Sequence, residues 1–277
     1  IFAALSINMR IVLLLLPFLL FIAVSCNEPA KNGSGNADDT NNPAPPMLSF
    51  TVVKIYPHDT TSFTEGLIWF NNTLYEGTGN KGSSRLIQSD IETGKTVKDV
   101  KLVKDFFGEG ITILNNKIYE LTWQEHKGFV YDLNTLQKLQ EFEWPFEGWG
   151  MTNNGKELII STGSSNLYFV NPDNFKINKT VSVFDNYGPV GNINELEYVN
   201  GVVYANHYLT QEIIRIDPES GKVTGKLDLT GIMDSNGVKY DPSKLDVLNG
   251  IAFNADKNTL YVTGKYWPAL FELKLNQ

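Results

Sequence analysis

Four glutamates stand beside glycine or asparagine in short motifs that return along the chain. They are Glu65 in FTEG (63–66), Glu109 in FGEG (107–110), Glu147 in EGWG (147–150) and Glu195 in NELE (194–197). A carboxylate held inside a cavity can take a proton from one part of a substrate and return it to another. The motifs therefore predict several candidate proton carriers.

Groups that could bind a substrate accompany these glutamates. They are the indoles of Trp123, Trp149 and Trp267, the ring of Phe63, the amide of Asn194 and the ammonium group of Lys265. An ammonium or amide group can donate hydrogen bonds to an oxygen that becomes negative during a reaction. Carboxylates, such a donor and aromatic walls together favour a small-molecule site.

The composition of the 277-residue chain excludes several classes of protein. With one cysteine and three histidines, it can form neither a disulfide framework nor a cysteine-rich zinc cluster. A formal net charge of -8 argues against a nucleic-acid partner, because phosphate binding needs clustered Lys and Arg. A hydrophobic content of 42% supplies a large core, so we expect a folded domain.

The single cysteine follows an export signal. Met9 and Arg10 precede an apolar run at 11–24, and Ser25-Cys26 after it resembles the end of a lipobox, in which the cysteine is lipidated and becomes the mature N-terminus. The run is shorter than a membrane span needs. We predict a signal peptide at 1–26, with 1–8 upstream of the translated protein. The protein would then lie at the bacterial cell envelope, touching the membrane only through its lipid; plain cleavage and a retained anchor are the alternatives.

A polar segment separates the signal from the folded domain. Residues 27–47 (NEPAKNGSGNADDTNNPAPPM) contain almost no core-forming side chain, which is typical of a flexible linker. We therefore expect the folded domain to span 48–277.

One hairpin pattern returns five times within this domain. An apolar strand leads into an Asn-rich turn, and the second strand carries Tyr or Ile at 75, 119, 159, 204 and 261, which are 44, 40, 45 and 57 residues apart. Asn-Asn and Asn-Gly pairs tolerate positive φ and favour tight hairpins. Repeats of this length with several short strands are typical of a β-propeller.

We predict an all-β fold, a five-bladed β-propeller of four-stranded antiparallel blades. A second hairpin follows in the first four repeats, whereas the fifth stops after its third strand at 270–275. The strand expected at 49–56 would complete that blade and close the ring without a free edge. The longest gap leaves an excursion at 230–248. A monomer is the default for a closed ring.

The topology brings the candidate residues to one face. In such a propeller, the loops between second and third strands open on the same side as the connections between blades, and all candidates lie in these two sets. We therefore expect one mouth that gathers them. A structural interpretation stays open for Glu147 and Glu195, which could accept hydrogen bonds from backbone amides of neighbouring loops. Likewise, Trp123 and Trp149 could simply fill the top of the channel.

Seven motifs in order resemble the plant-type glutaminyl-peptide cyclotransferases, also called glutamine cyclotransferases, of plants and bacteria. They are YPHDTTSFTEGL (56–67), FGEGIT (107–112), YELTWQEHKGFVYD (119–132), FEGWGMT (146–152), NELEYVNGVVYAN (194–206), DVLNGIAF (246–253) and LYVTGKYWPALFEL (260–273). The resemblance implies a five-bladed propeller that converts the N-terminal glutamine of peptides or proteins into pyroglutamate with loss of ammonia. It also implies chemistry without a metal or another cofactor.

The resemblance assigns individual residues. Glu109 matches the family's essential glutamate, and the matching pocket residues are Trp123, Trp149, Asn194 and Lys265. We assign proton transfer to Glu109, and the contact to the negative oxygen to Lys265 or Asn194. Two substrate-binding positions depart from the family pattern: Glu65 replaces a glutamine, and Tyr208 replaces a frequent tryptophan. We expect Glu65→Gln to be tolerated.

Two other functions stay open on the residues. One is a non-catalytic envelope propeller that binds peptide or glycan, with Glu65 as the sign of a site that has drifted. The other is a propeller hydrolase in which several carboxylates and Asn194 hold calcium. Ammonia release from a Gln-initiated peptide, with and without a chelator, separates the three.

Overall fold

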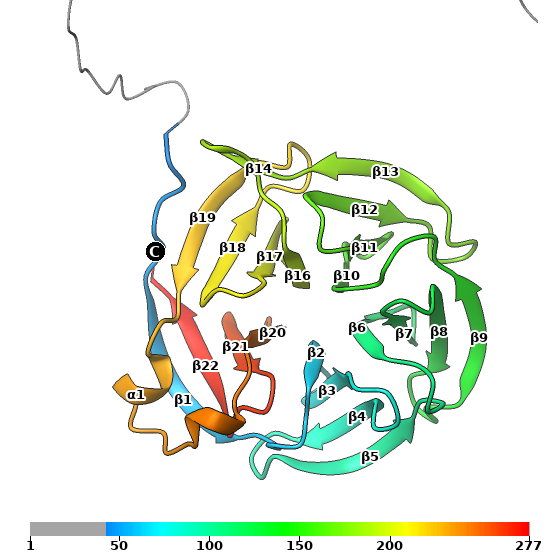
Figure 1. The fold of residues 1–277 in the computed structure, drawn as a ribbon, viewed down its shortest axis with the longest axis horizontal. Coiled ribbons are helices and arrows are strands. Elements are labelled where there is room, and N and C mark those ends of the chain that lie inside the picture. Colours follow the sequence, from blue (N-terminus) through cyan, green and yellow to red (C-terminus); the bar gives the residue numbers. More distant parts are fainter. Residues whose placement is uncertain (1–42, 277) are drawn as a thin grey trace, which may run out of the picture. The chain divides into compact units, whose positions relative to one another are not determined.

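The computed structural model of the chain describes residues 43–276. These residues form five four-stranded antiparallel sheets around one axis, with β2, β6, β10, β16 and β20 innermost (Figure 1). The predicted five-bladed propeller is therefore confirmed. The predicted signal peptide with Cys26, and the predicted linker as far as residue 42, lie outside the described residues.

The blades follow one another along the chain. Blade 1 holds β2 (Thr64–Phe70), β3 (Thr73–Thr78), β4 (Arg85–Asp90) and β5 (Lys95–Lys101). Blade 2 holds β6 (Gly108–Leu114), β7 (Lys117–Thr122), β8 (Lys127–Asp132) and β9 (Lys138–Glu143). Blade 3 holds β10 (Met151–Asn153), β11 (Leu158–Ser161), β12 (Asn166–Val170) and β13 (Ile177–Ser182). Blade 4 holds β16 (Ile193–Val199), β17 (Val202–His207), β18 (Glu212–Ile216) and β19 (Val223–Asp228).

Blade 5 joins the two ends of the described chain. It contains β20 (Leu248–Asn254), β21 (Thr259–Gly264), β22 (Ala269–Leu275) and, outermost, the N-terminal β1 (Phe50–Pro57). β1 pairs with β22 from Phe50 opposite Leu275 to Pro57 opposite Ala269, as the sequence predicts. Just before β1, the backbone N–H of Leu48 donates to Lys226 of β19 at 2.7 Å. The N-terminal segment thus ties blade 4 to blade 5.

The Asn-rich turns of blades 1 and 2 have the predicted backbone. Asn71 and Asn72 lie at φ 47° and 60°, and Asn115 and Asn116 at 51° and 62°. Two successive residues with positive φ match the right-handed twist of the paired strands, so each turn closes its hairpin without splaying it.

Two excursions leave the regular blades. Between β19 and β20, where the sequence predicts an excursion, lie α1 (Ile232–Ser235) and the short 3-10 helix Pro242–Lys244. A small hairpin, β14 (Phe184–Asp185) with β15 (Gly188–Pro189), stands between blades 3 and 4 and was not predicted. Within residues 43–276 neither helical segment has the length and apolarity that a bilayer span requires.

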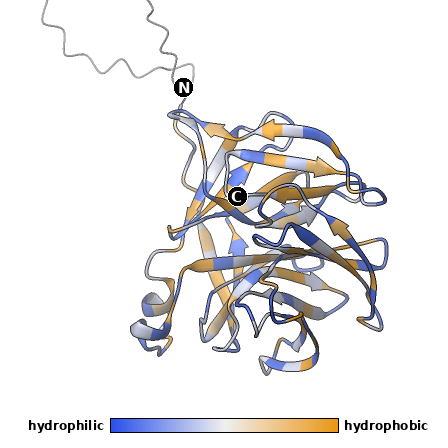
Figure 2. Cartoon of the chain, turned by 45° about the vertical axis from the view of Figure 1, so that its right-hand side comes forward, coloured by the Kyte–Doolittle hydropathy of each residue, from blue (hydrophilic) through white to orange (hydrophobic). Residues whose placement is uncertain are grey.

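The core lies between neighbouring blades. Leu86 of blade 1, for example, packs with Ile111 and Ile118 of blade 2, and all three are fully buried. In Figure 2 the strands carry most of the strongly apolar residues. Nearer the axis, glycines at the blade entries let the inner strands touch: a Cβ on Gly110 would stand 2.5 Å from the backbone nitrogen of Met151 in the next blade.

A substitution at Gly150 tests whether the close approach of the inner strands requires glycine. A Cβ at this position would overlap the carbonyl oxygen of Asn194 in blade 4. We expect Gly150→Ala to lower the free energy of unfolding by about 1–3 kcal/mol, because blades 3 and 4 must move apart. Thermal and urea unfolding measure the loss. Gly191→Ala is the matched control, since its nearest neighbour would be 3.9 Å away; equal stability losses in both variants would contradict the packing argument.

Candidate active site

A cavity of about 290 Å³ opens at the mouth of the propeller. All five blades contribute to its wall, which consists of Phe63, Glu65, Phe107, Glu109, Trp123, Trp149, Asn194, Tyr208 and Lys265. The structure therefore brings together every predicted catalytic and substrate-binding residue except Trp267. Phe107 was not singled out from the sequence, although it precedes Glu109 in FGEG just as Phe63 precedes Glu65 in FTEG.

Bulges in the first strands aim the polar side chains at the axis. In blade 1, Thr64 and Gly66 pair with the adjacent residues Thr78 and Gly77, so Glu65 is the extra residue. Blades 2, 4 and 5 have the same irregularity at 108–111, 193–196 and 248–251. A bulge leaves its extra residue unpaired and re-aims the side chain. Glu109, Asn194 and the neighbouring Asn249 all lie within these bulges.

A buried ion pair joins blades 1 and 5 inside the cavity. The ammonium of Lys265 lies 2.8 Å from Oε1 of Glu65, and both side chains are almost fully buried. Asn249 donates to the other carboxylate oxygen of Glu65 at 3.1 Å. The ammonium also lies over the rings of Phe63 and Tyr208, 4.3 and 5.4 Å from their centroids. The two aromatic faces add a favourable electrostatic contact to the ion pair.

Glu109 is the free carboxyl group of the cavity. It is 5% exposed, and within residues 43–276 we find no hydrogen bond to its oxygens. Burial raises the pKa of Glu109 well above its usual value, the nearby charge of Glu65 raises it further, and Lys265 opposes both. A carboxyl group with a raised pKa that faces an open cavity can hold a proton near neutral pH and pass it on.

The two cavity indoles are held from outside by Glu147. Trp123 and Trp149 both donate their N–H to Oε2 of Glu147, at 2.9 and 3.1 Å. Burial raises the pKa of Glu147, but the hydrogen bonds from Trp149, Gln124 and Trp123 outweigh it and hold the pKa below its usual value. Glu147 thus stays charged and orients the walls, which is a different part from the proton carrier that its motif suggested.

Asn194 presents an acceptor that lacks a partner. Its side chain is 3% exposed and lines the cavity, and its Oδ1 has no hydrogen-bond partner among the described residues. A buried carbonyl oxygen left unpaired costs free energy. Because Oδ1 is shielded from the cavity, Asn194 can contact a bound molecule through its amide nitrogen, which is the donor that the sequence suggested.

Glu195, which the sequence singled out as a candidate, belongs to the scaffold of the propeller. Glu195 is fully buried and accepts the backbone N–H groups of Leu67 at 3.1 Å and Ile251 at 2.8 Å, so it joins blade 4 to blades 1 and 5. Its structural interpretation is thus confirmed.

The structure places Trp267 outside the mouth cavity. Its indole donates to the backbone of Asp246 at 3.0 Å and lies against Gly264, away from the cavity. The left-handed φ of 62° at Tyr266 turns the chain between Lys265 and Trp267, so the two side chains face different ways.

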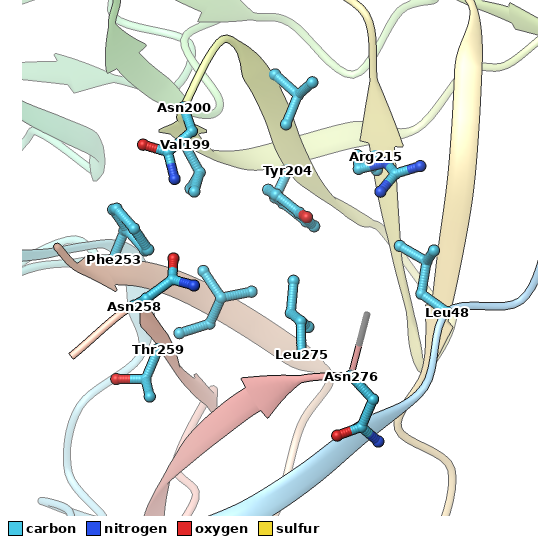
Figure 3. Close-up of a pocket in the computed structure, with 12 residues that line it drawn as sticks. Leu48, Val199, Asn200, Tyr204, Arg215, Phe253, Asn258, Thr259, Leu275 and Asn276 are labelled. Atoms are coloured by element: carbon cyan, nitrogen blue, oxygen red, sulfur yellow. The ribbon is translucent and has the colours of Figure 1, made fainter.

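A second cavity, of about 260 Å³, lies between blades 4 and 5 near the Asn-rich turns (Figure 3). None of its 12 described lining residues is acidic. Its one guanidinium, on Arg215, already donates to the hydroxyl and carbonyl oxygens of Thr224 at 3.0 and 2.9 Å. This cavity therefore offers no carboxyl group for proton transfer. Nowhere in residues 43–276 do three His, Cys, Asp or Glu side chains converge as a candidate metal site.

The fold and the mouth cavity define a five-bladed propeller with a buried site that holds two carboxyl groups, an ammonium and aromatic walls. Comparison with known proteins then indicates its family. Residues 21–275 match the model of a family described as glutamine cyclotransferase. A curated glutaminyl-peptide cyclotransferase of Arabidopsis thaliana is 40% identical over 229 residues, which cover 82% of this chain and 71% of that protein.

A solved structure agrees with this match. The crystal structure of Myxococcus xanthus glutaminyl cyclase superposes with a TM-score of 0.77 at 33% identity, covering 84% of this chain and 98% of that one. The chain belongs to the glutamine cyclotransferase family.

The role of Glu147 can be tested without turnover. We expect Glu147→Ala to leave both indole N–H groups without their acceptor and to loosen the two rings. The near-UV circular dichroism of the indoles should weaken and their fluorescence should shift to longer wavelength. Glu143→Ala, which removes a mostly exposed glutamate, is the control. Identical spectra for the two variants would show that Glu147 does not hold the rings.

Proposed function

We propose that this chain is a glutaminyl-peptide cyclotransferase that converts the N-terminal glutamine of peptides or proteins into pyroglutamate and ammonia, with Glu109 carrying the proton. The family match and the names of both relatives support the reaction. The observation that carries the role of Glu109 is its position: a buried carboxyl group, free of hydrogen bonds from the described residues, facing the same cavity as Lys265 and two indoles.

The reaction needs one proton to move between two nitrogens. The α-amine attacks the carbonyl carbon of the side-chain amide, a ring C–N bond forms, and the bond to the amide nitrogen breaks. The proton lost by the amine goes to Glu109 and from there to the departing nitrogen, which leaves as ammonia. For a neutral amine the carboxylate ends in its initial state. An amine that binds protonated brings one more proton, which leaves on the product as ammonium, so the cycle needs no other acid or base.

The raised pKa of Glu109 suits this transfer. A peptide amine has a pKa of about 8 and is mostly protonated at neutral pH. Transfer of its proton to a carboxylate with an ordinary pKa is strongly unfavourable. Burial and the charge of Glu65 raise the pKa of Glu109 toward that of the amine, so the transfer costs less free energy. The neutral, nucleophilic amine thus becomes accessible in the complex.

Lys265 and the indoles would complete the site. The carbonyl oxygen becomes negative in the tetrahedral intermediate, and an ammonium on the wall of the buried cavity would stabilise it. Trp123 and Trp149 would keep the glutamine side chain folded toward its own amine, which matters greatly in an intramolecular reaction. Because the cavity opens at the mouth, the rest of the peptide would extend outside.

Lys265 also bears on the calcium alternative. Its ammonium occupies the position next to Glu65 that a cation bound by this carboxylate would take. Like charges repel strongly in a buried site, so the observed pair disfavours calcium there.

Glu109→Gln tests the proposed reaction. We expect the rate of ammonia release from a Gln-initiated dipeptide to fall on the order of 10²–10⁴-fold, because the amide cannot accept the proton. Ammonia detection measures the rate, and thermal unfolding checks that the variant is folded. Wild-type activity in the presence of a chelator should be unchanged. A folded Glu109→Gln variant with full activity would refute the assigned role, and failure of the wild type on every Gln-initiated peptide would refute the function.

We also propose that Cys26 is lipidated and anchors the protein at the cell envelope. The apolar run before it and the small residues Ala23 and Ser25 support this. In a bacterial host, an alkyne-labelled fatty acid should be incorporated into the full chain and not into Cys26→Ser. Label on the serine variant, or no label on either, would contradict the proposal.

A further inference from the structure

The cavity holds two carboxyl groups and one ammonium, and the ammonium has a single carboxylate partner. Lys265 Nζ donates to Glu65 at 2.8 Å, while Glu109, on the wall of the same cavity, receives no hydrogen bond from the described residues. Burial makes an unpaired charge costly, so both carboxylates compete for this ammonium. The structure shows Glu65 as its partner.

Contacts around Glu65 and Lys265 favour this ion pair over one between Lys265 and Glu109. Asn249 holds Oε2 of Glu65 at 3.1 Å and leaves Oε1 directed to Lys265. The backbone N–H of Lys265 donates to Val247 at 3.0 Å, and the next residue, Tyr266, is fixed in a left-handed conformation by its N–H bond to Ser62 at 2.8 Å. The lysine is therefore anchored on the blade 5 side, beside Glu65, by contacts that do not involve Glu109.

We propose that Glu65 is a positioning residue: by binding the ammonium of Lys265, it prevents an ion pair between Lys265 and Glu109 and keeps Glu109 available to take the proton of the substrate amine. The inference deepens the proposed function and rests on it. It concerns the contacts that Glu65 makes in this chain.

The charges around Glu65 and Glu109 also support this role of Glu65. Glu109 faces Glu65, Glu147 and Glu125, which all raise its pKa, and Lys265, which lowers it. Burial raises the pKa of Glu65 to about 7 against the effect of Lys265, and Asp246 adds to the rise. Glu65 also faces the buried Glu195. As an ion pair, Glu65 and Lys265 are nearly neutral as a unit.

Replacing Glu65 by glutamine changes this balance in a defined direction. One negative charge beside Glu109 disappears, and Lys265 loses its carboxylate partner. Glu109 becomes the remaining cavity carboxylate that can pair with the ammonium. An opposite charge at contact lowers a carboxyl pKa by about 1–3 units, so Glu109 should become a weaker base while the reaction continues.

The pH profile of kcat/KM for a Gln-initiated dipeptide tests this. Its two limbs belong to Glu109 in the free enzyme and to the amine of the free peptide. In Glu65→Gln we expect the Glu109 limb to move to lower pH by about one unit or more, with the amine limb unchanged. Glu125→Gln is the matched control: it removes another negative charge that acts on Glu109 and leaves Lys265 paired, so its shift should be clearly smaller. Equal shifts, or no shift in Glu65→Gln, would overturn the proposal.

A titration of the free protein separates this proposal from the function itself. The infrared band of the protonated carboxyl group of Glu109, identified by its loss in Glu109→Gln, gives the pKa without turnover. We expect a lower pKa in Glu65→Gln and a raised one again in Glu65→Gln/Lys265→Met, where no ammonium remains to pair. An equally lowered pKa in both variants would show that Lys265 is not involved. A Glu65→Gln protein that does not fold would also count against the proposal, because Glu109 then fails to take over the ammonium. If these pKa values follow the expectation while no peptide releases ammonia, the proposed function fails and the positioning of Lys265 stands.

Discussion

The close approach of the inner strands is the constraint on which the rest of the structure depends. Five strands meet around one axis only if their backbones nearly touch, and a Cβ at Gly66 or Gly110 would stand 2.5 Å from a backbone nitrogen of the next blade. The hydrogen bond from Gly110 N–H to the carbonyl of Trp149, at 2.7 Å, uses this proximity to join blades 2 and 3. Glycine at these positions is therefore a requirement of the ring.

The same region produces the site. Where the first strands of blades 1, 2, 4 and 5 enter, each carries one extra residue, and the bulge directs polar side chains toward the axis. Closing the ring and presenting Glu65, Glu109 and Asn194 to one cavity are thus two results of one local geometry. The indoles and Lys265 then come from the loops that open on the same face.

The environment of each glutamate near the site depends on the groups that contact its carboxyl oxygens. Glu147 is held by indole N–H groups and stays ionised, Glu195 accepts backbone amides, and Glu65 binds Lys265. Only Glu109 among these four carboxyl groups lacks a hydrogen-bond partner in the described part of the chain. Four glutamates in similar sequence motifs therefore have four different environments, and the pKa of each follows from burial and from what its oxygens contact.

The sequence by itself determined the architecture and the composition of the site. Hairpins at a period of about 40 to 50 residues, Asn-rich turns and the missing fourth strand of the last repeat led to five blades closed by 49–56, because strand alternation and turn chemistry are local properties. Only the tertiary structure decided which carboxyl group is free, that Glu65 binds Lys265, that Phe107 lines the cavity and that Trp267 does not. The role of Glu195 depends on a bulge, and that of Trp267 depends on one left-handed residue, Tyr266. Each feature sets the direction of a side chain, and that direction has its effect only when blades distant in sequence pack together.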